Sequence, residues 1–268
     1  MLYIVSTPIG NLKDISFRAI ETLKTCDLVL AEDTRTSRAL FKTFEVETPM
    51  VSFYQFNEQR RKKMIVSKLL SGQRIALISD AGTPGICDPG ADLITTCRNM
   101  AIPMQTIPGP CALIAALSLY GIKGPFQFIG FLEKRRGALT RQLIDMLYYH
   151  STSVAYVSPH NLLKTLTLIP DNREIFLARE LTKLYEEMVH GSSTQLLNHF
   201  QKRGIRGEFV LILPPSGEEL QRDPRPLMEE LQGFFGINAK EAMVVAAKLL
   251  NRPKRELYDN LHRSRPES

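Results

Sequence analysis

The stretch RIALISDAGTPGICDPG at residues 74–90 decides the fold of this chain. Its first six residues form an apolar run that stops at Asp80, and such a run predicts a fully buried strand. The residues that follow are rich in Gly and Pro, which is typical of a tight loop. Strands buried on both faces belong to parallel sheets that helices cover on either side. The stretch therefore predicts an α/β domain.

The segments around it repeat the alternation of strand and helix. Short apolar runs predict strands at 2–5, 28–31, 50–53 and 104–107. Helical periodicity predicts helices at 14–25, 36–44, 58–70, 89–101 and 110–120. Asp14 is the expected N-cap of the first helix. Because strands alternate with helices, we expect residues 1–121 to form a first domain with a mostly parallel sheet.

A second α/β domain is expected at 122–218, where helices separate the strands less regularly. Its predicted strands lie at 126–131, 153–157, 174–178, 185–190 and 207–213, and its predicted helices at 137–149, 160–168 and 192–203. This order favours a mixed sheet.

A small helical C-terminal unit is expected at 224–268, after the Pro-rich stretch that starts at Asp223. Two of its helices, within 239–262, resemble a helix-turn-helix, in which basic side chains would contact phosphates. They equally fit a helical hairpin that docks on the main body or on another subunit. The basic residues concerned are Arg252, Lys254, Arg255 and Arg263.

Composition places the chain among ordinary globular proteins. Of its 268 residues, 44% are hydrophobic and 23% are charged, and the net charge is +6. A modest positive excess favours anionic partners. No apolar run approaches the roughly 20 residues that cross a bilayer, and the start MLYIVSTPIG lacks the basic region of a secretion signal. We therefore expect a cytoplasmic protein without a membrane segment, whose four cysteines are reduced.

Three loops are candidates for a ligand site because each follows a predicted strand and consists of turn residues. They read STPIGN at 6–11, SDAGTPGICDPG at 79–90 and PGPCA at 108–112. Ligands of open α/β sheets bind beyond the carboxyl ends of the strands, so these loops are expected to converge on one crevice. Tight turns without a ligand are the alternative. Neither G-x-G-x-x-G nor G-x-x-x-x-G-K-[ST] is present, which disfavours dinucleotide and P-loop sites.

Five motifs in order resemble one family. They are TPIGNL (7–12), AEDTR (31–35), SDAGTP (79–84), PGPCA (108–112) and ARELTK (178–183). They look like the signatures of the ribosomal RNA small-subunit methyltransferase I family, within the tetrapyrrole-methylase superfamily. The resemblance implies the two-domain fold of that superfamily, a homodimer, and methylation of the ribose 2′-hydroxyl of a decoding-region cytidine. The implied partner is small-subunit ribosomal RNA, free or in the assembled subunit.

The resemblance also implies the cofactor S-adenosylmethionine, held between the two domains. The implied cofactor-binding residues come from the three loops and from the second domain: Pro8, Ile9, Asp80, Ala81, Gly82, Thr83, Cys111, Ala112, Tyr156, Leu181 and Val210. Asp80 has a second interpretation, in which it caps the backbone amides of its own loop.

The implied chemistry is in-line attack of the ribose oxygen on the sulfonium methyl group, which requires no metal. Glu32 and Asp33, at a strand end, are the candidate general bases. Asp33 also fits an N-cap of the helix that begins near Thr34, so Glu32 is the preferred base. Arg35 and Arg38, on that helix, are candidates for phosphate contacts.

Two further basic segments are candidates for RNA binding. Arg60-Arg61-Lys62-Lys63 spreads around a helix, so only about two of its side chains face one ligand. Arg60 and Arg61 are assigned to RNA, as are Lys134 and Arg135 in a loop after a strand. Tyr54 and Asn57 are weaker candidates for contact with a base or ribose, and an ordinary loop role is the default interpretation of both.

Two other functions remain open from sequence. A methyltransferase acting on a tetrapyrrole shares the scaffold and cofactor, but it does not need the basic runs or the helical C-terminal unit. A non-catalytic RNA-binding assembly factor would leave the three loops unexplained.

Overall fold

The computed structural model describes residues 1–215 and 224–263. These residues divide into two compact units. The first consists of Met1–Gly121 with Ala178–Met188, and the second of Ile122–Leu177 with the described residues from Val189 onward. The ARELTK motif (178–183) thus belongs entirely to the first unit. The domain limits predicted from sequence, at 122–218 and 224–268, stay predictions.

A parallel sheet forms the centre of the first unit. Its strands are β1 (Leu2–Val5), β2 (Leu28–Ala31), β3 (Met50–Ser52), β4 (Ile75–Ile78) and β5 (Met104–Ile107), in the order β3-β2-β4-β1-β5. All pairs are parallel. Because β4, β1 and β5 are neighbours and run parallel, the loops that follow them lie at the same edge of the sheet, beyond the carboxyl ends of the strands.

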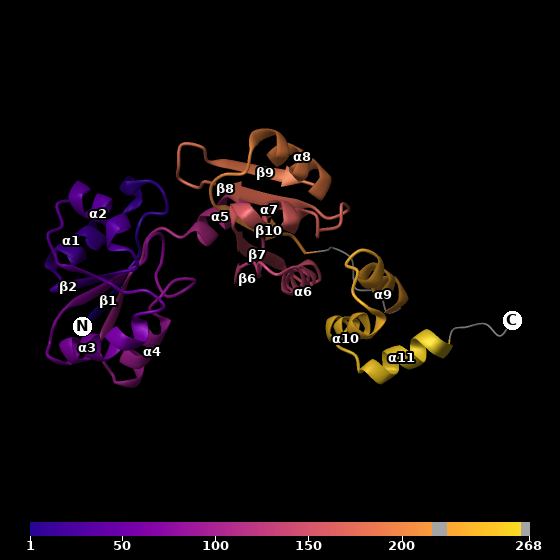
Figure 1. Cartoon of the computed structure of the whole chain (residues 1–268), viewed down its shortest axis with the longest axis horizontal. Coiled ribbons are helices and arrows are strands. Elements are labelled where there is room, and N and C mark those ends of the chain that lie inside the picture. The colour runs from indigo at the N-terminus through magenta and orange to yellow at the C-terminus, as the bar shows by residue number, and fades with distance from the viewer. Residues whose placement is uncertain (216–223, 264–268) are drawn as a thin grey trace. The chain divides into compact units, whose positions relative to one another are not determined.

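Helices cover both faces of this sheet, as Figure 1 shows. The helices that cover it are α1 (Phe17–Thr25), α2 (Thr34–Thr43), α3 (Glu58–Leu70) and α4 (Ala91–Asn99); α5 (Ala112–Tyr120) also belongs to the first unit. Alternate strand residues face opposite sides, so Val29 packs with α1 and α2 while Leu30 packs with α3 and α4. The predicted α/β class with a parallel first sheet is confirmed.

The start of the first helix differs from the prediction. Leu12–Asp14 form a short 3-10 turn, and α1 begins only at Phe17. Ser16 is the N-cap, and its hydroxyl accepts a hydrogen bond from the Ala19 amide at 3.1 Å. The prediction of Asp14 as N-cap was wrong because Ile15 and Ser16 are extended, which ends the turn before the helix starts.

The second sheet is mixed, as predicted. It contains β6 (Phe126–Phe131), β7 (Thr152–Val157), β8 (Ile175–Arg179), β9 (Glu187–Gly191) and β10 (Phe209–Leu213), in the order β6-β7-β10-β8-β9. β7 runs parallel to β6 and antiparallel to β10. The register shifts between Phe128 and Phe131, where Gly130 has φ +80° and allows the irregularity.

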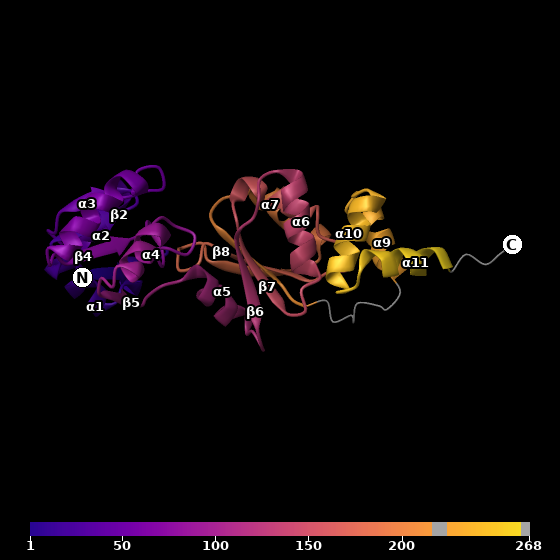
Figure 2. The ribbon, with the colours of Figure 1, turned by 90° about the horizontal axis from the view of Figure 1, so that it is seen from below.

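The helices of the second unit share one hydrophobic core with this sheet. They are α6 (Arg136–Leu147), α7 (Pro159–Leu166), α8 (Ser193–Arg203), α9 (Pro224–Gly233), α10 (Ala239–Leu249) and α11 (Lys254–Arg263). Figure 2 shows α9, α10 and α11 gathered in one cluster.

Ion pairs tie the C-terminal helices to α6. Arg141 pairs with Glu241 and Lys248 with Asp145, each at 2.7 Å. Arg252 pairs with Glu256 instead of standing open for a phosphate, and the side chain of Arg263 lies outside the described side chains. These contacts favour the docked hairpin over the helix-turn-helix.

Candidate active site

The first two candidate loops are joined by a backbone bridge. The Thr7 amide donates to the Gly82 carbonyl at 2.9 Å, and the Gly82 amide donates to the Thr7 carbonyl at 3.1 Å. Gly82 has φ +78°, in the left-handed region that glycine adopts without strain. The loop after β4 therefore turns back onto the loop after β1.

The third loop joins them through side-chain and backbone contacts. The Thr83 hydroxyl lies 2.9 Å from the Ser6 hydroxyl and 3.4 Å from the Pro110 carbonyl, to which it donates. A Cβ atom on Gly109 would lie only 3.0 Å from Ser6 Cβ, so glycine permits this close approach. The structure thus brings together the three loops that sequence analysis selected.

The ARELTK motif also contacts the first loop. The Asn11 amide donates to the Thr182 hydroxyl at 3.1 Å. A Cβ atom on Gly10 would lie 2.5 Å from Lys183 Cγ and 3.1 Å from the Leu181 carbonyl oxygen, so glycine permits the two segments to approach closely. Leu181 is buried in this segment.

The proposed cofactor residues of the first unit differ in exposure. Pro8 and Gly82 are buried, Asp80 and Ala81 are exposed, and the others, Ile9, Thr83, Cys111 and Ala112, are half-buried. Tyr156 and Val210 belong to the second unit, where they face each other across the β7–β10 pair. The Tyr156 ring lies 5.0 Å from that of Phe128 and 5.3 Å from that of Phe131, between ring centroids.

Carboxylates gather beside these loops, at the ends of β2 and β4. Burial raises the pKa of Glu32 above its usual range, and the negative charges of Asp80 and Asp88 raise it further. Burial is also the first cause of the raised pKa values of Asp80 and Asp88.

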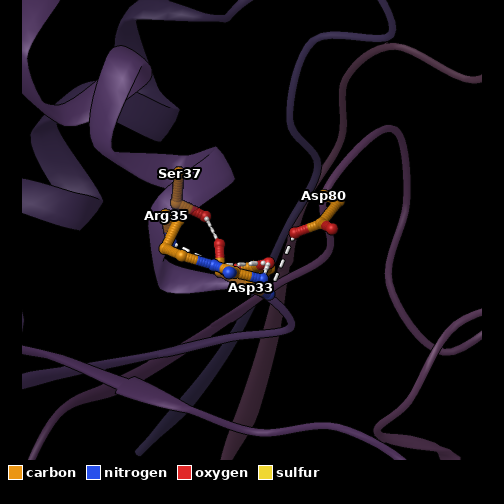
Figure 3. A network of polar contacts seen from close by, with 4 residues as sticks. All are labelled: Asp33, Arg35, Ser37 and Asp80. Atoms are coloured by element: carbon orange, nitrogen blue, oxygen red, sulfur yellow. Dashed lines mark hydrogen bonds and ion pairs between the residues drawn. The ribbon is translucent and has the colours of Figure 1, made fainter.

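Asp80 connects the two strand ends, as Figure 3 shows. Its Oδ1 accepts a hydrogen bond from the Asp33 amide at 3.0 Å. The Asp80 amide lies close enough to the Glu32 carboxylate to stabilise its charged form, which partly offsets the rise of the Glu32 pKa. The hydrogen bond of the Asp80 side chain therefore reaches a neighbouring loop instead of its own loop.

Asp33 is engaged in structural contacts. Its Oδ1 accepts from the Arg35 amide at 2.8 Å and so caps α2, as the second interpretation of this residue expects. The Arg35 guanidinium donates to both carboxylate oxygens, with Nη2 at 2.7 Å from Oδ2. These hydrogen bonds lower the pKa of Asp33 to about 2. A carboxylate so stabilised in its charged form is a weak base, which leaves Glu32 as the better candidate.

The basic candidates lie at the surface. Arg35 is bound to Asp33, with 83% of its side chain exposed. Arg38 and Arg60 are exposed and Arg61 is half-buried, all in the first unit. Lys134 and Arg135 are exposed in the second unit, just before α6.

Two other features are absent from the described residues, 1–215 and 224–263. No three His, Cys, Asp or Glu side chains there come together in a way that suits a metal ion. None of the helices in that part of the chain is both long enough and apolar enough to span a membrane.

Sequence reasoning missed two residues of this edge. Asp88 belongs to the quoted loop, but its proximity to Glu32 depends on how the loop folds back. Ser6 has no role predicted from sequence, yet its hydroxyl lies 2.9 Å from the Thr83 hydroxyl. Ser6 could have been recognised from its position, because it is a polar residue directly after a buried strand.

Comparison with known proteins gives a consistent answer. Residues 1–197 match the family model of the Tetrapyrrole (Corrin/Porphyrin) Methylases. The chain is 38% identical to the ribosomal RNA small subunit methyltransferase I of Bacillus subtilis, over 98% of this chain and 94% of that protein. It is 41% identical to the protein of the same name from Thermotoga maritima, over 81% of this chain and 99% of that protein.

Solved structures resemble the chain in fold. A cobalt precorrin-4 methyltransferase has a TM-score of 0.62 at 14% identity, covering 80% of this chain and 94% of that one. The uroporphyrin-III C-methyl transferase of Thermus thermophilus, complexed with S-adenyl homocysteine, has a TM-score of 0.55 at 17% identity, covering 80% and 96%.

Proposed function

Because this chain belongs to the ribosomal RNA small subunit methyltransferase I family of the tetrapyrrole methylases, we propose that it methylates a cytidine of small-subunit ribosomal RNA on the ribose 2′-hydroxyl. The target lies in the decoding region, as the motif resemblance implies. The observation that carries the proposal is the meeting of three loops beside the carboxylates of Glu32, Asp80 and Asp88.

The cofactor is S-adenosylmethionine, and when bound it supplies a methyl group activated on a sulfonium. The first unit fits such a nucleoside. Ala81 and Ala112 have only a methyl side chain, which leaves room for a ligand beside their loops, and Gly82 allows the turn that joins two of these loops. The Asp80 carboxylate complements a cation. Pro8, Ile9, Thr83 and Cys111 would add contacts from the same loops, and Tyr156, Leu181 and Val210 are proposed for the adenine side.

Glu32 is proposed as the group that takes the proton of the ribose hydroxyl. A raised pKa makes its carboxylate a better proton acceptor than an ordinary glutamate. Asp33 would hold α2 and Arg35 in place instead of reacting. Arg35 and Arg38 would then lie near the phosphates that flank the target nucleotide.

RNA backbone contacts are proposed for Arg60, Arg61, Lys134 and Arg135. Free RNA and the assembled small subunit both remain candidate substrates. A homodimer is proposed from the family resemblance alone, and a cytoplasmic location from the sequence features described above. The fold neighbours act on tetrapyrroles, as their names state, but they are far less similar in sequence than the ribosomal RNA methyltransferases.

Mass mapping of ribosomal RNA from cells with and without this protein tests the proposal. We expect one cytidine to lose a methyl group in cells that lack the protein, and to regain it with the wild-type chain but not with Glu32→Gln. In vitro, labelled S-adenosylmethionine should mark small-subunit RNA. Label in a tetrapyrrole and none in RNA would overturn the proposal, and so would an absence of cofactor binding.

A further inference from the structure

Two aromatic rings stand exposed just after β3. Phe56 is 91% exposed and Tyr54 is 41% exposed. Their ring centroids lie 6.4 Å apart at an interplanar angle of 66°. Large apolar side chains exposed together on a soluble surface often mark a binding site.

The turn that carries the rings is held by its own hydrogen bonds. The Asn57 side-chain Oδ1 accepts from the Tyr54 amide at 2.9 Å, and its Nδ2 donates to the Ser52 carbonyl at 3.2 Å. The Glu58 amide donates to the Tyr54 carbonyl at 2.9 Å. The rings are therefore presented by an ordered turn, which lowers the entropic cost of binding.

Contacts with α4 fix the other end of the turn. Glu58 is 7% exposed, and its Oε1 accepts from the Leu93 amide at 3.1 Å. Gln59 Nε2 donates to Asp92 Oδ2 at 2.6 Å. The N-cap of α4 is a glycine without a capping side chain, so Glu58 from α3 supplies the missing acceptor. The turn is thereby anchored to the body of the first unit.

The turn lies at the same sheet edge as the candidate base. The amide of buried Phe53 donates to the carbonyl of Ala31 at 2.7 Å, and Ala31 directly precedes Glu32. Tyr54 is therefore the residue that follows this backbone hydrogen bond to the end of β2.

A run of four basic residues lies a few positions after the two rings along the chain. Arg60-Arg61-Lys62-Lys63 occupies the first half of α3, where the described structure gives none of these four side chains an ion-pair partner. Flat exposed rings beside uncompensated cations are the combination that single-stranded nucleic acid recognises, because bases stack on rings while phosphates meet cations.

We propose that Tyr54 and Phe56 form a stacking platform for an unpaired nucleobase of single-stranded RNA, with Arg60 and Arg61 contacting the adjoining phosphates. This rests on the proposed function, since it assumes that the substrate is RNA. Bases inside a duplex are already stacked and do not present a free face. The platform therefore selects an unpaired target and holds its strand beside Glu32.

The test measures binding of the full-length protein to a short single-stranded RNA that carries 2-aminopurine. Phe56→Ala and Tyr54→Ala are each expected to weaken binding about tenfold or more and to reduce the stacking-dependent fluorescence change. The salt dependence should stay the same, because no phosphate contact is removed. Arg60→Gln should instead lower the salt slope by about one.

Phe17→Ala is the matched control. Phe17 is an aromatic residue of the same unit, 88% exposed, at the start of α1. It should leave RNA binding unchanged. A duplex RNA of the same sequence should bind the wild type and Phe56→Ala equally.

The outcomes separate this inference from the proposed function. If Phe56→Ala binds the single strand and changes its fluorescence like the wild type, the platform is refuted, whether or not the wild type methylates RNA. If Phe56→Ala instead changes only self-association in sedimentation, the rings form a protein interface and the inference is also overturned. If the wild type methylates no RNA while the platform variants lose stacking, the inference stands and the proposed reaction fails.

Discussion

Gly82 offers a direct test of whether the three loops form the cofactor site. Its φ is +78°, and Gly121, at the end of α5, has φ +70°. A side chain in the left-handed region costs roughly 1–2 kcal/mol. Replacement of either glycine by valine should therefore lower the free energy of unfolding by about that amount through backbone strain alone.

The surroundings of the two glycines differ. A Cβ atom on Gly82 would lie 3.4 Å from Ile9 Cγ2 and 3.8 Å from the Pro110 carbonyl oxygen, whereas nothing lies within 4 Å of a Cβ on Gly121. The two γ methyl groups of valine extend beyond Cβ, so at Gly82 they must push the loops apart. Overpacking of this kind costs about 1–3 kcal/mol more.

The expected result is a difference in cofactor affinity between two variants that share the same backbone strain. Gly82→Val should bind S-adenosylmethionine at least tenfold more weakly, which is ~1.4 kcal/mol, while Gly121→Val should keep the wild-type affinity. Gly82→Ala carries the strain without the γ methyl groups and should fall between wild type and Gly82→Val. Urea unfolding reports the stability loss, and titration calorimetry reports the affinity.

Equal affinities of Gly82→Val and Gly121→Val for the cofactor would refute the reasoning. In that case the loops would be joined to each other for stability, and the ligand would bind elsewhere. If both variants lose affinity for the cofactor, global destabilisation is the cause, and lowered urea midpoints in both variants would show it.

Three further predictions concern the carboxylates. Because burial and neighbouring charges raise the pKa of Glu32, its carboxylate is protonated at a higher pH than that of an ordinary glutamate. The acid limb of single-turnover methyl transfer should therefore lie above the usual glutamate range. Asp33→Asn should keep this limb, and the slow residual transfer by Glu32→Gln should lack it; the opposite pattern would exchange their roles. The pKa of Asp33 is lowered to about 2, so its contribution to stability is present above its unfolded pKa and is lost as pH falls towards 2. Acid unfolding monitored by circular dichroism should therefore depend less on pH in Asp33→Ala than in the wild type. An unchanged unfolding curve would contradict the capping role of Asp33. Glu58→Ala leaves the Leu93 amide without its acceptor and should lower the free energy of unfolding by about 1–3 kcal/mol. Glu58→Gln retains an acceptor oxygen and should lower it by less. Equal losses of unfolding free energy in the two variants would show that the charge of Glu58 stabilises the fold and that the hydrogen bond does not.

The sequence predicted the strands of the first unit well because their signals are local. A buried parallel strand is a short apolar run bounded by turn residues, as at 75–78. The start of α1 was missed because two polar residues, Asp14 and Ser16, both suit an N-cap. The choice between them depends on backbone angles that the side-chain pattern does not determine.

The meeting of the loops was predictable for a topological reason. Loops that follow parallel strands emerge at the same edge of the sheet, so their convergence needs only the strand assignment. The contacts of Asp80 were not predictable in the same way, because its partner, the Asp33 amide, is 47 residues away in sequence. Likewise, the buried Glu58 looks like an ordinary first-turn glutamate until α4 is placed beside it.

The distribution of charge on the first unit constrains how RNA would approach. Glu32, Asp80 and Asp88 lie together at the loops, and their mutual repulsion is part of the reason for their raised pKa values. Phosphate groups are repelled by the same carboxylates, so the RNA backbone gains nothing by lying over them. The uncompensated cations of α3 attract the backbone beside the carboxylates instead. A nucleotide held there by its phosphates and by a stacked base leaves its ribose as the neutral part that can enter the acidic edge, which is what a reaction at a sugar hydroxyl requires.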